Sequence, residues 1–515
     1  MARASHSGES SRTSTSAPAE SVSTTSAGPG FRRELGLYDS TMVVAGGMIG
    51  SGIFLVTADM ARLLGSAGWV LVAWAITAVL TLAAALTYGE LAAMMPQAGG
   101  QYVYLREAFS PLAGFLYGWT LFTVIQTGTV AAVTVGFARH VGLFLPWIAE
   151  DRWIVPPVHI SAHYALSLST AQALAIAVVA LITWMHTRGI ALGRIVQDVF
   201  TTAKIGILLA LLGLGLLLGR HGAGIAENFG RAWEQRGLVT VSPGLDASTP
   251  GGLLAALAVA QVGSLFSSDA WNNITFAAAE VRRPKRDIPL ALAIGTGLVV
   301  GLYFLANLVY FAVLPLAAVQ NAPSDRVGAA AMEAMLPGLG AKLLAAGILV
   351  STFGCANGML LAGARAYWAM ARDGLFFRGA GRLNDRGVPE RGLFLQGLWT
   401  AALVLVRTFD PSTGKYGNLY GSLLDYVVSA ALLFYALTVL AVFRLRATRP
   451  DAPRPYRAIG YPVVPALYVV AALFIVAQLA IHRAETTWPG FAIVLLGLPV
   501  YGLLRGRLAA RGEEG

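Results

Sequence analysis

The sequence is poor in charged residues. Asp, Glu, Lys and Arg make up 12% of its 515 residues, whereas a soluble globular chain carries about 25%. Hydrophobic types make up 56%. A surface with so little charge would not keep a chain of this size in solution, so a soluble multidomain protein is excluded, as are disordered and collagen-like chains. We therefore expect a membrane protein.

Cysteine is almost absent, and residues for catalysis or metal binding do not cluster. Cys355 is the single cysteine, so no internal disulfide can form, and the seven histidines show no metal-ligand spacing. We expect no metal and no cofactor. An enzyme would need a nucleophile–base pair at membrane depth, and a channel would need repeated polar rings. Neither pattern is present, so neither class is expected.

Basic residues exceed acidic ones, with 37 Lys and Arg against 27 Asp and Glu. In a soluble protein this excess would suggest nucleic acid, but basic loops facing an anionic lipid leaflet explain it better. Residues 1–34 are rich in Ser and Thr and lack the apolar stretch of a signal peptide. We expect them to form a disordered cytoplasmic tail, with a second short tail at 509–515.

Long apolar runs fill the rest of the chain. They approach or exceed the roughly 20 residues that span a bilayer and predict an all-α polytopic membrane protein. The twelve expected transmembrane helices are 37–62, 67–94, 101–145, 171–187, 192–219, 250–280, 289–316, 340–371, 392–409, 420–445, 462–481 and 485–508. With the N-terminus inside, most Lys and Arg residues fall in cytoplasmic loops, which predicts a cytoplasmic membrane protein with both termini inside.

The first span contains a cluster of small residues, Ala45-Gly46-Gly47-Met48-Ile49-Gly50-Ser51-Gly52-Ile53-Phe54. Each Gly weakens a helix by about 1 kcal/mol relative to Ala. The cluster is explained either by a close helix–helix contact or by local unwinding. Unwinding would expose backbone N–H groups at the start of an outer half-helix, whose positive dipole end can hold a carboxylate.

The sixth span contains an equally unusual polar stretch, Ser264-Leu265-Phe266-Ser267-Ser268-Asp269-Ala270-Trp271-Asn272-Asn273. An Asp at the bilayer centre costs about 2.5–3.5 kcal/mol, so it should face a cavity or a partner. Two separate surface helices, 250–265 and 274–281, are the alternative, which the length of the run disfavours. Broken helices at matching positions of two halves are typical of inverted-repeat transporters. The repeats would be 37–219 and 250–445.

Four stretches carry a family resemblance: Gly50–Phe54, Phe266–Trp271 with its continuation through 280–289, Val196–Lys204, and Asn357–Phe377. Together they resemble the amino acid–polyamine–organocation (APC) superfamily, and within it bacterial relatives of the L-type amino acid transporters. The resemblance implies a LeuT-type fold of five plus five helices, with two peripheral helices at 462–508. A single transporter domain would then cover 35–508.

The resemblance also implies a substrate site for a zwitterionic amino acid. The substrate carboxylate would meet N–H groups near Ser51 and Gly52, and its ammonium would meet carbonyls of Phe266, Ser267 and Asp269. Phe266 would also close the site from outside, as a gate. The complete set of candidate substrate-binding residues is Met48, Ile49, Gly50, Ser51, Gly52, Phe266, Ser267, Asp269 and Asn272.

Lys204 lies inside the fifth span. One interpretation is that its side chain extends to the cytoplasmic face. The resemblance instead places its ammonium beside the unwound part of the first span, where sodium-driven relatives of the fold hold a cation. This implies sodium-independent transport of amino acids by exchange or another secondary mechanism, with proton-coupled symport as the alternative.

The sequence departs from the family pattern in two places. Many relatives have an aromatic residue and a Gly where this chain has Ser268 and Ala270, so the substrate is left open. Animal members pair with a glycoprotein through a Cys after the third span, and no Cys occurs in 139–170. We therefore expect no covalent heavy-chain partner. The oligomeric state is also left open.

Overall fold

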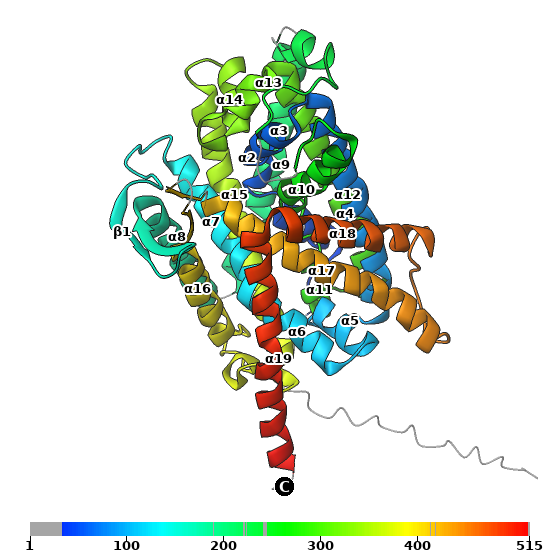
Figure 1. Cartoon of the computed structure of the whole chain (residues 1–515). Helices are drawn as coiled ribbons and strands as arrows, with labels where there is room; N and C mark the ends of the chain where they lie inside the picture. Colours follow the sequence, from blue (N-terminus) through cyan, green and yellow to red (C-terminus); the bar gives the residue numbers. More distant parts are fainter. Residues whose placement is uncertain are drawn as a thin grey trace, which may run out of the picture.

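The computed structural model describes residues 33–512, apart from 189, 220–221, 223, 240–244, 412–413 and 418, and apart from the side chains of 190–198, 410 and 505–512. The predicted tails 1–32 and 513–515 lie outside the described residues. The described chain is mainly a bundle of long helices (Figure 1). Ten segments are long and apolar enough to cross a membrane, and a bent helix pair at the start of the chain makes eleven.

The ten segments correspond to ten of the predicted spans. They are α4 (Ala67–Met94), Pro111–Val141, α8 (Thr170–Thr187), α9 (Ile190–Leu218), α10 (Pro250–Ser267), α12 (Pro284–Val313), α15 (Gly340–Arg372), α17 (Leu419–Thr448), α18 (Val463–His482) and α19 (Ala484–Gly512). The first member of the bent pair, Leu37–Leu55, contains α1 (Leu37–Met48) and α2 (Gly52–Leu55), and the second member is α3 (Thr57–Leu64). This is a polytopic membrane protein.

The third predicted span, 101–145, is wrong at its start. Residues Gln101–Ala108 form a separate helix, α5, and the membrane segment begins at Pro111 as α6 (Pro111–Thr120). Proline fits the first turn of a helix but disfavours helical conformation in the residue before it. The Ser110 side chain caps the new helix by accepting a hydrogen bond from the Ala113 N–H (3.2 Å). A π-helical turn (Leu121–Ile125) connects α6 to α7 (Gln126–Val141).

The all-α expectation is also wrong in part. A four-stranded antiparallel sheet contains β1 (Trp153–His159), β2 (Tyr164–Ser169), β3 (Val406–Asp410) and β4 (Lys415–Tyr416), in that spatial order. The predicted span 392–409 therefore ends early, as α16 (Glu390–Leu405), with 16 residues. Its last residues pair with β2 instead, in a register that places Tyr164 opposite Thr408.

The two interrupted helices lie at the centre of the bundle. Helix α1 packs against α12, α9 and α15, whereas α10 packs against α3, α4, α17 and α18. After the interruption, the second helix continues as the short α11 (Asn273–Phe276). A connecting segment with α13 (Leu316–Gln320) and α14 (Val327–Met335) lies over α3 at the top of Figure 1.

Candidate functional site

The first interruption falls within the glycine cluster. Helix α1 ends at Met48, and Ile49 has an extended conformation (φ −76°, ψ 93°) before α2 begins at Gly52. The helix axis then bends by 51° between Leu37–Leu55 and Thr57–Leu64. The glycine cluster therefore marks a real break in the first span.

The carbonyl groups freed at the end of α1 are all occupied. A helix leaves its last four carbonyls without backbone partners, and here each of the carbonyls of residues 46–49 accepts a hydrogen bond from a side chain of another helix. The donor–acceptor distances are 2.7 Å from Lys204 Nζ to Gly46 O, 3.1 Å from Cys355 Sγ to Gly47 O, 2.9 Å from Tyr303 Oη to Met48 O and 3.1 Å from Ser351 Oγ to Ile49 O.

The N–H groups on the other side of the break have no backbone acceptor. Those of Gly50, Ser51 and Gly52 donate no hydrogen bond to a carbonyl of any residue that the structure describes, and the Gly50 N–H faces the Tyr303 hydroxyl. The Ser51 hydroxyl lies 3.1 Å from the Tyr420 hydroxyl of α17. The break therefore offers backbone donors without backbone acceptors, an arrangement that can bind an anion.

The second interruption separates α10 from α11. Ala270 adopts a left-handed conformation (φ 66°) that L-residues rarely use. Of the three carbonyls predicted for a substrate ammonium, that of Phe266 already accepts the Asp269 N–H (3.1 Å). A carbonyl oxygen has two lone pairs, so one acceptor position remains. The Asn272 side chain donates to Gln101 Oε1 (3.2 Å), which ties this break to α5.

The two breaks touch each other. A Cβ atom on Gly52 would lie 2.3 Å from Ser267 Oγ, and a Cβ on Gly47 would lie 3.1 Å from the Ala270 carbonyl. Only glycine fits at position 52 without movement of the neighbouring helix. The structure thus brings the predicted residues of the first and sixth spans together.

The Asp269 carboxylate is buried at the contact between the breaks, with the residue 9% exposed. It accepts a hydrogen bond from Tyr435 Oη of α17 at 2.5 Å. No cationic side chain of the described residues lies within ion-pair distance of it. Cavities of about 20 and 10 Å³ adjoin it, so the site has room for a water molecule but is closed to anything larger in this conformation.

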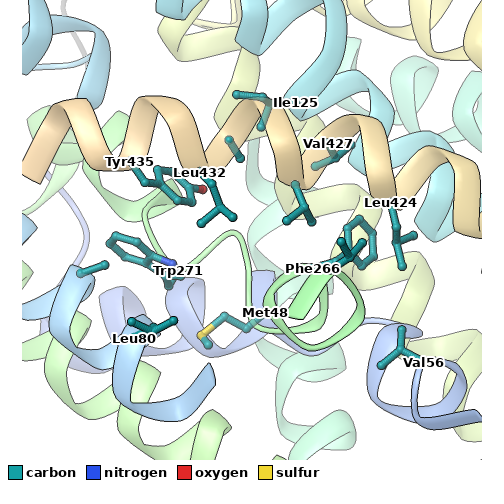
Figure 2. Close-up of a cluster of buried hydrophobic side chains, with 14 of the residues drawn as sticks. Met48, Val56, Leu80, Ile125, Phe266, Trp271, Leu424, Val427, Leu432 and Tyr435 are labelled. Atoms are coloured by element: carbon teal, nitrogen blue, oxygen red, sulfur yellow. The ribbon is translucent and has the colours of Figure 1, made fainter. Parts of the chain in front are cut away.

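Phe266 contacts Tyr420, which lines a larger cavity of about 520 Å³. Its ring is 5% exposed and meets Tyr420 edge-on, with 6.1 Å between ring centroids. Figure 2 shows Phe266 beside Leu424 on one side of the break and Trp271 beside Tyr435 on the other. Trp271 is a buried packing residue, 2% exposed.

Lys204 reaches the break from α9. Its side chain is 1% exposed and its ammonium contacts the Gly46 carbonyl. The alternative of an exposed ammonium at the membrane surface does not fit this burial. No carboxylate of the described residues pairs with it.

The comparisons with known proteins decide the family. The amino acid permease family model matches residues 35–501. The chain belongs to the amino acid permease family. The permease is 28% identical over 473 residues to the b(0,+)-type amino acid transporter 1 of Mus musculus, covering 90% of this chain and 86% of the relative. It is 29% identical over 496 residues to the large neutral amino acids transporter small subunit 2 of Rattus norvegicus, covering 96% and 84%.

The family match confirms that the permease is an APC-superfamily transporter and not an enzyme. These relatives are mammalian, so the expected likeness to bacterial members stays a prediction.

Two charged residues of the permease outside the candidate site are paired. Glu90 binds Arg446 through both oxygens (2.9 and 2.6 Å), and Arg365 pairs with Glu280.

Sequence reasoning missed most of the side chains that complete the site. Tyr303, Ser351, Cys355, Tyr420 and Tyr435 come from three helices and carry no local signal, because single polar residues in apolar runs are common. Their role is visible only through the atoms they contact. A search for isolated hydroxyl and thiol groups on the spans around the breaks would have found them.

Proposed function

We propose that the permease moves amino acids across the cytoplasmic membrane by alternating access, with both termini in the cytoplasm and a LeuT-type arrangement of twelve helices. The contact between two broken helices carries the proposal. One break presents N–H groups without backbone acceptors at Gly50–Gly52, and the other presents carbonyls at Phe266, Ser267 and Asp269. These complementary partial charges suit the carboxylate and ammonium of a zwitterionic amino acid.

Transport by this mechanism is independent of sodium. A sodium site would need oxygen ligands, but the carbonyls of residues 46–49 each bind a side-chain donor, and one of those donors is the Lys204 ammonium. The fixed positive charge takes the place of a bound cation. The cycle is an exchange of amino acids, with proton-coupled symport as the second candidate because Asp269 is a buried carboxylate without a cationic partner.

The Asp269 carboxylate also indicates the substrate class. A buried carboxylate is stabilised when a cation approaches it, and a substrate with a cationic side chain supplies one. The permease therefore transports amino acids such as lysine or arginine.

A single cysteine, buried in α15, supports the absence of a covalent partner subunit.

Uptake into proteoliposomes tests the function. Faster uptake of labelled L-lysine when L-lysine is loaded inside supports exchange, whereas dependence on an inward proton gradient supports symport. Failure to transport any amino acid in either condition contradicts the proposal.

We expect Asp269→Asn to reduce L-lysine uptake by about 10- to 100-fold, because a hydrogen bond to a charged group contributes about 1.5–3 kcal/mol. L-leucine uptake should change little. Tyr435→Phe is the matched control, because it removes the hydroxyl partner and keeps the carboxylate. Equal losses for lysine and leucine, together with loss of proton dependence, would assign Asp269 to proton coupling instead.

We expect Phe266→Ala to slow transport on the order of tenfold, the factor that corresponds to an aromatic contact of about 1.5 kcal/mol. Substrate binding should weaken less, because the backbone contacts remain. Parallel uptake and equilibrium-binding measurements with L-lysine check this. Tyr420→Phe, which keeps the ring packed against Phe266, is the control for the aromatic contact. Unchanged transport by Phe266→Ala would rule out the gate.

A further inference from the structure

The wall of the 520 Å³ cavity contains a chain of ion pairs that the proposed substrate site does not use. The cavity lies between α3, α10, α17 and the α18–α19 connection, on the outer side of the break in the first span in the orientation proposed above. Asp59 and Asp325 both line it. Asp325 belongs to the segment between α13 and α14 that covers α3.

Asp325 forms ion pairs with two helices that are far apart in the sequence, α3 and α7. Its Oδ1 lies 2.9 Å from Arg62 Nη2 on α3, and its Oδ2 lies 3.7 Å from Arg139 Nη1 at the end of α7. Arg62 also donates to the Gln320 carbonyl of α13 (2.8 Å). The same carboxylate therefore holds the outer half of the broken first span against α7 and the covering segment.

At the Arg139 end of this series of ion pairs, further contacts hold the Arg139 side chain in place. Arg139 Nε donates to Glu150 Oε1 (2.6 Å), and Arg407 lies 3.8 Å from the other oxygen of Glu150. Burial of Glu150 opposes its ionisation, but the two guanidinium groups hold the pKa of this carboxyl below its ordinary value. Arg139 also stacks on the Tyr420 ring, 5.3 Å from its centroid. Arg62, the other partner of Asp325, lies on α3, beyond the bend at Val56 where the helix axis changes direction.

The backbone that carries Asp325 is strained. Ser324 and Asp325 have φ angles of 53° and 61°, in the left-handed region that disfavours L-residues. Such strain persists only where surrounding contacts enforce it, and it is concentrated in switch regions. Here the enforcing contacts are the two arginines, since they hold the carboxylate from both sides.

We propose that Asp325 is a latch that limits the width of the outer cavity by holding Arg62 of α3 and Arg139 of α7 together, and that its strained backbone relaxes when Arg62 is released. The inference rests on the alternating-access function proposed above. If Asp325 acts as this latch, two variants should have opposite effects on the width of the cavity. Loss of the carboxylate should widen the cavity, whereas relief of the strain in the latched state should keep it narrow.

Labelling of a cysteine in the cavity tests the latch without any transport measurement. Ser422→Cys places the reporter in the cavity wall, and the protein without this change is the background because Cys355 is buried. Reaction with an uncharged maleimide should be about tenfold faster after Asp325→Asn, the factor for one charged hydrogen bond. Ser324→Gly, which keeps the carboxylate, should slow it.

Asp59→Asn is the matched control. It removes the same charge from the same cavity, but the Asp59 side chain is 60% exposed, and its contacts with Arg62 (3.5 Å) and Arg483 (3.7 Å) are longer than the 2.9 Å between Asp325 and Arg62, so its loss should have a smaller effect. Arg62→Gln should accelerate labelling as Asp325→Asn does, and the double variant should add nothing further, because both changes break one contact. Equal labelling rates for Asp325→Asn and Asp59→Asn, or additive effects in the double variant, would overturn the latch. Since labelling needs no substrate, its outcome is independent of whether the permease carries amino acids.

Discussion

Replacing Lys204 with Ala should reduce amino acid transport by about 10- to 100-fold, because a hydrogen bond to a charged group contributes about 1.5–3 kcal/mol. The variant removes the donor to the Gly46 carbonyl and leaves a buried carbonyl unpaired beside the substrate site. Lys204→Met separates charge from volume, since it keeps an unbranched side chain without the ammonium. Both variants should show this reduction in transport, and both should still insert and purify.

Sodium provides the second part of this test. Uptake of L-lysine by wild-type proteoliposomes should be the same with and without a sodium gradient, and sodium should not rescue Lys204→Ala, because no carboxylate of the described residues lies at the vacated position. Full activity of Lys204→Ala, or strong stimulation of the wild type by sodium, would contradict the role of Lys204 as a substitute cation.

Gly52→Val should abolish substrate binding. The added Cβ would lie 2.3 Å from Ser267 Oγ, and overpacking of this kind costs about 1–3 kcal/mol, which corresponds to about a 5- to 150-fold loss of affinity. Thermal-shift titration with L-lysine measures the effect. Gly301→Val is the control for expression, because a Cβ there meets no atom within 4 Å.

A double variant distinguishes two reasons for this loss. Gly52→Ala combined with Ser267→Gly removes the contacted side chain and keeps both backbones. If the glycine serves only close helix packing, the double variant recovers binding. If the N–H groups of residues 50–52 hold the substrate carboxylate, the new methyl group still crowds the ligand and binding stays weak. Recovery would therefore refute the carboxylate site.

The sequence predicted those features that depend on residues close together in the chain. Apolar runs located the spans, and the glycine cluster and the polar stretch located both breaks. The extended β3 strand was missed because Val406–Asp410 continues an apolar helix without a turn signal. The side-chain donors to the α1 carbonyls and the Asp325 contacts were missed for a different reason. They join residues far apart in sequence, and neither spacing nor composition records such pairs.

The sheet has a consequence for how the chain is made. Strands β1 and β2 follow α7 directly, but β2 pairs with β3, which follows α16. Arg407 at this junction donates to the Glu150 carbonyl, 257 residues earlier. A ribosome adding about 5–20 residues per second needs on the order of tens of seconds to cover that distance. During synthesis, the edge of β2 that later pairs with β3 therefore stays unpaired and can pair with a strand of another chain. Truncation before α16 should leave a nascent protein that is prone to aggregate or to be degraded.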